Sequence, residues 1–549
     1  MNNKPLIYRW FPLIGAALIV GGMWLGFLLA GGDRMTPGQE KLQSIYKIIE
    51  EEYVDDIETD SLIEMTIPAL LRNLDPHSMY VAREELDRVN RDLESSFFGI
   101  GIQFQLMNDT ICVVEVVPGG PAERVGMMPG DRIVAVDGKS MTGKSITNED
   151  VLSTLRGEKD TKVKLTVRRS GASKPLKFEI TRGEIPSVSV NAAYMLDKET
   201  GYLRVTKFAA NTYAEFLQAL NSLRNKGAKN FVLDLRGNSG GLLDQAILIA
   251  NEFLPPYRSI VQTKGRKELE NANWLADGTG SFAEEPLVVL IDEFSASSSE
   301  IVAGAIQDND RGLVIGRRSF GKGLVQRQIS LPDSSQLRLT VQRYYTPSGR
   351  CIQKDFTRGQ NDSYDSEVFD RYANGEIFSA DSVKFDPEKV FSTIGGRKVY
   401  GGGGIMPDVF VPSDTTGYSS YYLSVANAGL LQKFAYEYAD LNRADLSKAK
   451  NVNELLRLLP SRDVLLSAFI HYAVGNGVPA RWYYINISAS LIVNQLRALI
   501  AGDILGQSAY YEIFNQSDSV VKEAMKQIKQ GVSQSIESGK PKEQPQTDE

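Results

Sequence analysis

A continuous apolar run, a serine-rich cluster and a helical pattern follow one another near the middle of the chain. Leu287 to Ile291 is apolar and rich in β-branched residues, as expected for a strand buried on both faces. Ser295 to Ser299 forms the cluster, a helix-compatible segment then ends near Asp308, and Leu313 to Gly316 predicts a second strand. This order predicts a βαβ unit with serines at the carboxyl end of its first strand, where open α/β sheets bind ligands.

The α/β pattern extends on both sides of this unit. Tyr202 to Phe208 and Phe231 to Leu235 predict strands, Thr212 to Lys226 predicts an amphipathic helix between them, and Leu337 to Tyr345 predicts a further strand. Residues 354–396 interrupt the pattern because they are polar and acidic without a sustained period. We expect a surface insertion there.

Residues 95–184 alternate strand patterns with turn signals, as in a small β domain. Asn148 to Leu155 predicts a helix within it. The expected strands are Gly99 to Leu106, Ile111 to Val117, Ile133 to Val136 and Val163 to Arg168.

Helical periodicity dominates both ends of the chain. Gln39 to Asn73 shows it in two parts, and residues 414–535 show it over most of their length. The tyrosines of the latter region, Tyr418, Tyr421 and Tyr422, are expected to be ordinary packing residues. The polar tail from Glu537 to Glu549 is expected to be disordered.

Phe11 to Ala30 is an uncharged stretch of 20 residues, long enough to cross a bilayer as a helix. Lys4 and Arg9 precede it, which favours a cytoplasmic N-terminus and a body outside the cytoplasm. A cleaved signal peptide is the alternative. We favour a retained anchor because the apolar run is long and its end is a poor small-x-small cleavage site.

The composition bounds the classes of function. With 549 residues the chain should hold three or four folded units, and its net charge of −7 gives no basic footprint for nucleic acid, so no nucleic-acid partner is expected. Two cysteines are too few for a disulfide framework, and Cys112 lies in an apolar strand pattern typical of the core. Neither a metal site nor a cofactor is predicted, since no His/Cys cluster has zinc-ligand spacing.

A reactive serine needs a base, and histidine is the usual one. The two histidines, His77 and His471, are both far in sequence from the serine cluster, and His77 beside a turn is expected to be structural. Lys322, flanked by glycines in Phe-Gly-Lys-Gly, is the natural substitute. Its pKa would have to fall from about 10.4 towards roughly 7 to 8, so it should be desolvated. The alternative is an exposed loop lysine.

Ser297 and Glu300 also fit the S-x-x-E capping box of a helix start. Capping and catalysis are compatible, because a helix N-terminus offers unpaired N–H groups to a developing oxyanion. The local pattern therefore leaves both roles open.

An ordered set of motifs resembles the carboxyl-terminal processing peptidases, or tail-specific proteases, which are Ser/Lys enzymes. The resemblance covers roughly residues 40–412. Besides the PDZ-like segment, the motifs that carry it are Leu74-Asp75-Pro76-His77-Ser78, Asp234 to Gly241, the serine cluster with Glu300 to Ala305, Phe320 to Gly323, and Gly403 to Asp408.

The resemblance implies roles for individual residues. Ser297 would be the nucleophile, Lys322 the base and Gln326 the residue that orients the lysine. The N–H groups of Gly240 and Ser298 would form the oxyanion hole, although the family usually has alanine at the latter position. Positions that support the site without reacting would be Arg236, Glu300 and Asp308.

Within residues 95–184, Pro121 to Gly126 and Pro129 to Asp131 resemble the short helix and turn of a PDZ domain. In that family the loop that here comprises Phe98, Gly99, Ile100 and Gly101 presents backbone N–H groups to a peptide's terminal carboxylate. Val151 and Leu155 would face the incoming side chains. A glycine-rich hairpin start is the alternative.

These inferences predict an α/β and α+β multidomain protein: a transmembrane helix, a PDZ-like β domain, an α/β Ser/Lys protease core and a C-terminal helical region. The expected segments are 1–34 anchor, 35–94 helical unit, 95–184 PDZ-like domain, 185–413 protease core with insertion 354–396, 414–535 helical region and 536–549 tail.

The predicted function is a membrane-anchored endopeptidase that captures free C-termini of proteins or peptides and hydrolyses them through an acyl-enzyme. We expect its body on the periplasmic side of a bacterial inner membrane, with a homo-oligomer as a possible state. Two alternatives remain: an anchored PDZ scaffold with an inactive protease-like domain, and an acyl-transfer enzyme acting on a small thioester.

Overall fold

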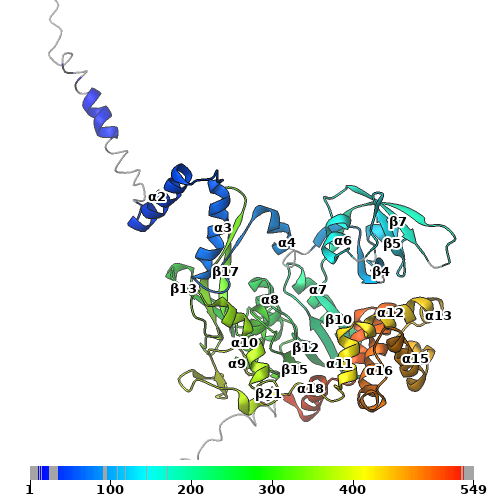
Figure 1. Ribbon diagram of the computed structural model, residues 1–549. Helices are drawn as coiled ribbons and strands as arrows, with labels where there is room; N and C mark the ends of the chain where they lie inside the picture. Colours follow the sequence, from blue (N-terminus) through cyan, green and yellow to red (C-terminus); the bar gives the residue numbers. More distant parts are fainter. Residues whose placement is uncertain are drawn as a thin grey trace, which may run out of the picture. The chain divides into compact units, whose positions relative to one another are not determined.

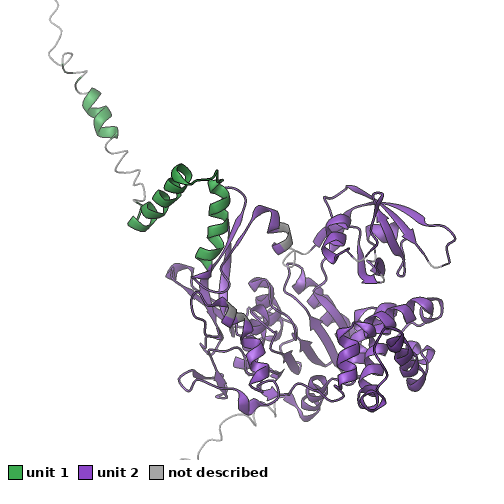
Figure 2. Ribbon diagram, in the orientation of Figure 1, with its two compact units in different colours: residues 1–71 green, residues 72–549 purple. Residues whose placement is uncertain are grey.

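The computed structural model describes residues 10, 13, 15–23, 35–90, 96–107, 109–117, 119–143, 145–169, 171–532 and 536. Figure 1 shows the fold of the chain, and Figure 2 shows its division into two compact units, residues 1–71 and 72–549. Helices α2 (Pro37–Glu52) and α3 (Thr59–Arg72) confirm the two-part helical prediction. Thr36 and Gln39 form a capping box that starts α2, with proline in its first turn.

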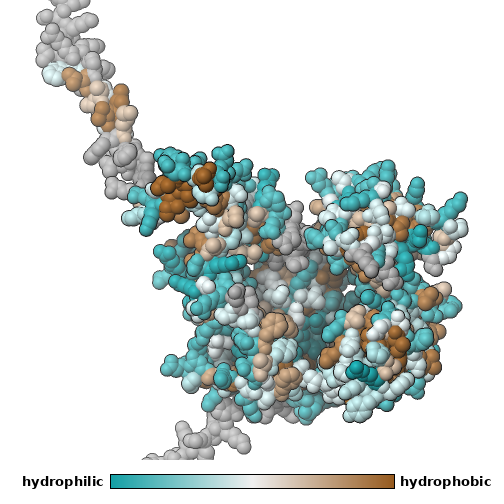
Figure 3. Space-filling view, in the orientation of Figure 1, coloured by the Kyte–Doolittle hydropathy of each residue, from teal (hydrophilic) through white to brown (hydrophobic). Residues whose placement is uncertain are grey.

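Apolar side chains of α2 are exposed to solvent. Leu42, Ile45 and Ile48 have exposed fractions of 49%, 45% and 58%. Figure 3 shows apolar side chains gathered on α2. A soluble surface helix normally buries such a stripe.

Part of the predicted span Phe11 to Ala30 lies outside the described residues. Within the span, residues 15–23 are described, and they are helical. Within the described part of the chain, one helix is long and apolar enough to cross a membrane, and it is α16 (Trp482–Leu505). Half of its most apolar window is buried within the protein, and its buried apolar residues belong to the core of the C-terminal helical region.

A six-stranded sheet forms the centre of the second unit, in the order β10-β11-β12-β15-β16-β21. All neighbours from β11 onward are parallel, while β10 is an antiparallel edge strand. Helix α9 (Ser298–Asp308) connects β15 and β16, which confirms the predicted βαβ unit. The strands are β10 (Val190–Met195), β11 (Thr200–Val205), β12 (Asn230–Asp234), β15 (Leu287–Ile291), β16 (Leu313–Gly316) and β21 (Val409–Phe410).

Helices cover both faces of this sheet because side chains alternate along each strand. Leu287, Val289 and Ile291 share one core with α7 (Thr212–Asn225), α8 (Leu243–Phe253) and α9. Val288 and Leu290 point to the other face and pack with Val520, Val521 and Ala524 of α18 (Ser519–Gln530). The C-terminal region therefore supplies a layer of the α/β core.

A second, antiparallel sheet carries the predicted strand near residue 340. It contains β1 (Met79–Val81), β13 (Ser259–Gly265), β14 (Ala272–Leu275), β17 (Leu324–Ser330) and β18 (Gln336–Tyr345). β17 begins two residues after Lys322, so the lysine lies where the chain passes from the parallel sheet to the antiparallel one.

The predicted small β domain is present, with one correction. Its five-stranded path is β3 (Ile102–Met107), β4 (Thr110–Val116), β5 (Arg132–Val136), β7 (Lys162–Arg168) and β8 (Leu176–Thr181), and its helices are α5 (Pro121–Arg124) and α6 (Asn148–Leu155). Val151 and Leu155 are 0% and 4% exposed, because the inward face of α6 packs on the domain core. The prediction that they face incoming side chains is wrong for this structure.

The C-terminal region is helical, as predicted. Tyr421 and Tyr422 are buried in its core, and Tyr418 packs on Tyr422. The helices are α11 (Ser420–Asn427), α12 (Leu430–Leu441), α13 (Arg443–Leu446), α14 (Val452–Leu458), α15 (Arg462–Gly475), α16, α17 (Gln507–Phe514) and α18. The tail 537–549 lies outside the described residues.

Residues 354–396 differ from the predicted surface insertion. They contain α10 (Asn361–Ala373), in which Tyr364, Val368 and Arg371 are buried. The apolar period is weak because one of the buried positions is an arginine.

Candidate active site

Three loops at the carboxyl ends of parallel strands meet in one cleft. They follow β12, β15 and β16, and they contribute Gly240, Ser297 and Lys322 to the cleft lining. Carboxyl ends of parallel strands lie at the same edge of a sheet, which explains why residues far apart in sequence converge here.

Ser297 has an unusual backbone at the start of α9. Its φ of 54° and ψ of −112° lie in a region that L side chains rarely adopt. Such a strained strand-to-helix turn projects a nucleophile above a sheet. Glu300 accepts the Ser297 N–H at 2.8 Å, as a capping box requires, so capping and side-chain presentation coexist.

The other serines of the cluster are buried and bound. Ser298 donates to the carbonyl of Gly241 at 3.0 Å, and Ser299 donates to that of Asn238 at 2.8 Å. Ser295 donates to Leu235 at 2.9 Å. Ser297 is the partly exposed member among Ser295 to Ser299. Its hydroxyl is therefore the one placed to meet a substrate.

Lys322 is half-buried beside this serine loop in the cleft wall. Its Nζ donates to Gln326 Oε1 at 3.4 Å, and Gln326 Nε2 donates to the His77 carbonyl at 2.7 Å. Burial lowers the pKa of Lys322, and the charge of Arg338 lowers it further. Both effects favour the neutral amine that a general base requires.

His77 contributes its carbonyl to this chain of hydrogen bonds. Burial lowers the pKa of its ring to about 4, and the Lys322 charge adds to the effect. The ring is therefore neutral at pH 7, and its Nε2 lies 2.9 Å from the Tyr364 hydroxyl. Asp75 fixes the turn by accepting the N–H groups of His77 and Ser78, both at 2.9 Å.

Glu300 joins the serine loop to the lysine loop. Its fully buried carboxylate accepts the N–H groups of Ser297 at 2.8 Å, Gly321 at 2.7 Å and Lys322 at 2.9 Å. Burial raises its pKa to about 7, although these bonds and one from Ser319 oppose the rise. Glu300 holds the serine loop and the lysine loop without lining the cleft.

Tyr344 makes a second link that the sequence analysis missed. Its buried hydroxyl lies 3.1 Å from the Ser297 carbonyl and also bonds the Lys322 carbonyl. The strand pattern predicted β18, but no local signal indicated that this tyrosine reaches the active-site loops.

The two predicted oxyanion donors lie next to Ser297. A Cβ on Gly240 would come within 2.7 Å of the Ser297 Cβ and 3.1 Å of the Ser298 nitrogen, so this approach requires glycine. The Gly240 N–H donates to Asn238 Oδ1 at 2.9 Å in this structure. An oxyanion would have to replace that acceptor.

Arg236 holds the start of the glycine loop. Its guanidinium pairs with buried Asp234 at 2.7 Å and with Asp518, the N-cap of α18, at 2.8 Å. Although burial opposes it, the charges of Arg236 and Arg204 hold the pKa of Asp234 well below its usual range.

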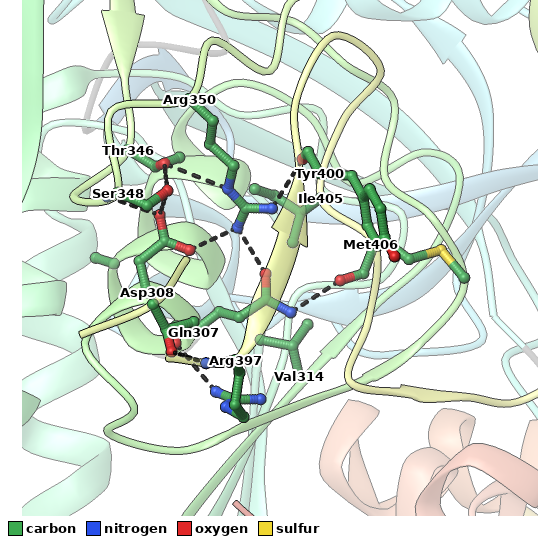
Figure 4. Close-up of polar contacts among 12 residues, drawn as sticks. Gln307, Asp308, Val314, Thr346, Ser348, Arg350, Arg397, Tyr400, Ile405 and Met406 are labelled. Carbon is green, nitrogen blue, oxygen red and sulfur yellow. Dashed lines mark hydrogen bonds and ion pairs between the residues drawn. The ribbon is translucent and has the colours of Figure 1, made fainter. Parts of the chain in front are cut away.

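Asp308 lies at the opposite end of α9 from Ser297. Its carboxylate accepts Arg350 at 2.7 Å and the Ser348 hydroxyl at 2.7 Å (Figure 4). Arg350 also donates to Gln307 at 2.6 Å. This network anchors the C-terminal end of the helix, so Asp308 does not contact the cleft.

The predicted carboxylate-binding loop is a loop over half of its length, because Phe98 and Gly99 belong to β2 (Ser96–Gly99), which pairs with β9 (Gly183–Pro186). The carbonyls of the other two residues are bound. Ile100 accepts the Ala122 N–H at 2.8 Å, and Gly101 accepts the Val117 N–H at 3.0 Å. Gly101 has a φ of 78°, and Phe98 is 40% exposed. The described residues contain no group of three or more His, Cys, Asp or Glu side chains placed to hold a metal ion.

Comparison with known families matches three parts of the chain. Residues 199–359 match Peptidase family S41, residues 112–169 match a PDZ domain, and residues 421–506 match a family of unknown function (DUF8443).

Curated relatives and a solved structure resemble the chain over rather more than half of its length. A carboxy-terminal-processing protease of Bartonella bacilliformis is 39% identical over 56% of this chain and 71% of its own length. The carboxy-terminal processing protease CtpA of Bacillus subtilis is 35% identical over 57% of this chain and 66% of its own length. A photosystem II D1 C-terminal processing protease structure is 29% identical, covering 58% of this chain and 91% of that chain with a TM-score of 0.32.

Three of the motifs, Asp234 to Gly241, the serine cluster with Glu300 to Ala305 and Phe320 to Gly323, lie within the S41 match, and its βαβ unit carries the serine. Leu74 to Ser78 and Gly403 to Asp408 lie outside the S41 and PDZ matches. The prediction of a serine peptidase with a PDZ domain is confirmed at the level of the family. The chain belongs to the carboxy-terminal-processing proteases.

Proposed function

We propose that this protein is an endopeptidase in which Ser297 attacks the scissile carbonyl and Lys322 acts as general base. The observation that carries the proposal is the shared cleft, where one partly exposed serine in a strained turn accompanies a half-buried lysine. Lys322 takes the hydroxyl proton, an acyl-enzyme forms on Ser297, and the amine returns the proton to the leaving group. Water then hydrolyses the ester with the lysine again as base.

Gln326 orients the lysine through the bond to its Nζ, anchored by His77. The Ser298 and Gly240 N–H groups would stabilise the oxyanion, the latter after exchanging Asn238 for the substrate oxygen. Arg236, Glu300 and Asp308 would position the loops and the helix.

Removal of either reacting group tests the dyad. Protein lacking residues 1–34 is incubated with an unfolded polypeptide, and Ser297→Ala and Lys322→Ala should each reduce cleavage by about 10³-fold or more. Cleavage that survives both substitutions would refute the assignment. An inactive scaffold would instead show no cleavage by the unmodified chain, and a thioester enzyme would turn over a small thioester.

We further infer that the PDZ domain recognises a free substrate C-terminus through residues Phe98 to Gly101. Support comes from the PDZ match at residues 112–169, which follows these residues in the chain, and from Ile100 and Gly101, whose carbonyls already accept backbone N–H groups. A peptide and its C-terminally amidated form should differ in rate, since amidation removes the terminal charge. Equal rates would contradict recognition of the carboxylate.

The uncharged stretch Phe11 to Ala30 supports an anchor with the body on the periplasmic side of a bacterial inner membrane. The exposed apolar side chains of α2 support a homo-oligomer. Membrane fractionation of the full chain and of a chain lacking residues 1–34 would test the anchor. Light scattering of the same two proteins would test the homo-oligomer.

A further inference from the structure

Arg371 of α10 binds the backbone of the lysine loop. Its side chain is 2% exposed and donates to the carbonyls of Ser319 at 2.8 Å, Phe320 at 3.0 Å and Arg318 at 3.4 Å. These carbonyls immediately precede Gly321 and Lys322. The helix belongs to the insertion 354–396, to which the sequence assigned no purpose.

Neighbouring residues of the insertion bind the Arg371 guanidinium and one further carbonyl of the lysine loop. Glu367 accepts Arg371 Nε at 2.8 Å and Lys354 Nζ at 3.1 Å. The backbone N–H of Lys354 donates to the Gly321 carbonyl at 2.9 Å. Four successive carbonyls, from Arg318 to Gly321, are therefore bound by residues 354–371.

The backbone N–H groups of the same loop are bound by side-chain acceptors. Glu300 takes the N–H groups of Gly321 and Lys322, and Gln353 Oε1 takes that of Gly323 at 2.8 Å. Glu300 belongs to α9, whereas Arg371 comes from the insertion, so the loop is clamped between two elements. An irregular loop without its own ladder keeps one conformation only when such partners are supplied.

The insertion also contacts the residues that orient the lysine. The Tyr364 hydroxyl lies 2.9 Å from His77 Nε2, and the His77 carbonyl holds Gln326. The Lys354 ammonium lies 4.0 Å and 4.1 Å from the ring centroids of Phe320 and Tyr364. One segment thus supports Lys322 through its loop and through Gln326.

We propose that residues 354–373 form a clamp that sets the position of Lys322, with Arg371 as its central positioning residue. The proposal rests on the proposed function, because it matters for catalysis only if Lys322 is the base. Arg371 touches no reacting atom. Its loss would leave three carbonyls without their donor, and the loop would rearrange towards water to satisfy them.

The chain offers a matched control. Arg311 also uses its guanidinium to hold three carbonyls, those of Phe253 at 2.6 Å, Phe282 at 2.7 Å and Glu285 at 2.7 Å. Arg311 precedes β16 and Glu285 precedes β15, so this network lies at the amino ends of the parallel strands, the edge opposite the cleft. Arg311→Met should destabilise the fold without reaching Lys322.

The first readout is independent of turnover. In a Ser297→Ala parent, the pH dependence of Lys322 acetylation by limiting acetic anhydride is followed by peptide mass spectrometry. Arg371→Met should move the Lys322 titration to higher pH, because a more hydrated amine holds its proton more tightly. Arg311→Met should leave the titration unchanged. An unchanged titration in Arg371→Met, or an equal shift in both variants, would overturn the clamp.

The second readout uses the active chain. Arg371→Met should lower kcat at pH 7 about tenfold or more with KM little changed, and part of the loss should be recovered at higher pH. Arg371→Lys, which keeps the charge but places its donors on a single nitrogen, should give an intermediate kcat. This variant provides the test if the methionine variant does not fold. An alkaline shift absent from both Arg371 variants would refute the proposal. Cleavage surviving in the Ser297→Ala parent would refute the proposed function instead.

Discussion

Glu300 connects the proposed nucleophile Ser297 to its proposed base Lys322 through backbone N–H groups. Both carboxylate oxygens accept donors, Oε2 from Ser297 and Lys322 and Oε1 from Ser319 and Gly321. Glu300→Gln would replace one of these accepting oxygens with an NH₂ group, which would face two hydrogen-bond donors instead of accepting from them. We expect a loss of about 1–3 kcal/mol in the free energy of unfolding and a large fall in kcat. Urea unfolding and cleavage assays measure both.

Glu300→Gln should also change how the free energy of unfolding depends on pH. The folded-state pKa of Glu300 is raised from its ordinary value of 4.5 to about 7, so the folded chain binds this proton more tightly than the unfolded chain does. Stability from this group is present below about pH 4.5 and is lost as pH rises to about 7. Glu300→Gln should therefore flatten the decline between pH 5 and 7.5. An unchanged slope would contradict the assignment.

Arg338 offers a test of how the pKa of Lys322 is lowered. It lines the cleft, and its charge lowers the pKa of Lys322. Because the base must be neutral, activity should rise with pH through that pKa. Arg338→Gln should move the acidic limb of kcat/KM to higher pH. Arg327→Gln, which removes an exposed arginine of the same cleft, should leave the limb in place; equal shifts would argue against the effect.

At the residue scale, the sequence predicted those residues of the candidate site that stand within short local motifs. Ser297, Glu300 and Lys322 stand within short stretches with clear chemical patterns. Tyr344 and Arg371 reach the same loops from a strand and an insertion, and they act on backbone atoms. No pattern of residue types identifies such a partner.

At the scale of elements, α18 belongs to the protease core although it comes last in the chain. Asp518 caps it by accepting the N–H groups of Val520 at 2.9 Å and Val521 at 3.0 Å, and it pairs with Arg236 beside the glycine loop. One residue therefore couples a helix start to the predicted oxyanion loop.

Two substitutions separate these roles. Asp518→Ala removes the cap and the ion pair, and should cost about 1–2 kcal/mol and lower kcat. Asp518→Asn keeps a capping oxygen, so it should retain most of the stability while losing the charge beside Arg236. Thermal unfolding and cleavage rates compare them. Equal stabilities would contradict the capping role.

The regular elements were predictable because burial imposes their periods. Leu287–Ile291, Leu313–Gly316 and Asn148–Leu155 have the predicted bounds. Helix α10 was missed because Tyr364, Val368 and Arg371 are its buried positions, and an arginine among them weakens the apolar pattern. The burial of Arg371 depends on backbone carbonyls contributed by the lysine loop.

At the scale of the whole molecule, the PDZ domain packs on the C-terminal helices. Cys112 and Met107 form a buried cluster with Tyr436 of α12, and Arg132 pairs with Asp440 at 3.4 Å. The sequence predicted Cys112 as a core residue. Its partner lies outside every motif, so this contact could not be predicted.

Tyr436→Ala should loosen this contact. Burial of a large aromatic side chain is worth on the order of 2–3 kcal/mol, and the alanine variant should show faster hydrogen exchange in β4 and faster limited proteolysis around the PDZ domain. Tyr483→Ala, which truncates a tyrosine 74% exposed, is the control. Identical protection in the two variants would show that the contact contributes nothing.

The most direct test of the account is to find which residue carries the acyl group. The chain is mixed with a peptide ester, quenched in acid within the first turnover and mapped by mass spectrometry. We expect the acyl group on Ser297, and we expect its loss in Lys322→Ala at neutral pH. An acyl group on Ser298, or undiminished acylation without Lys322, would contradict it.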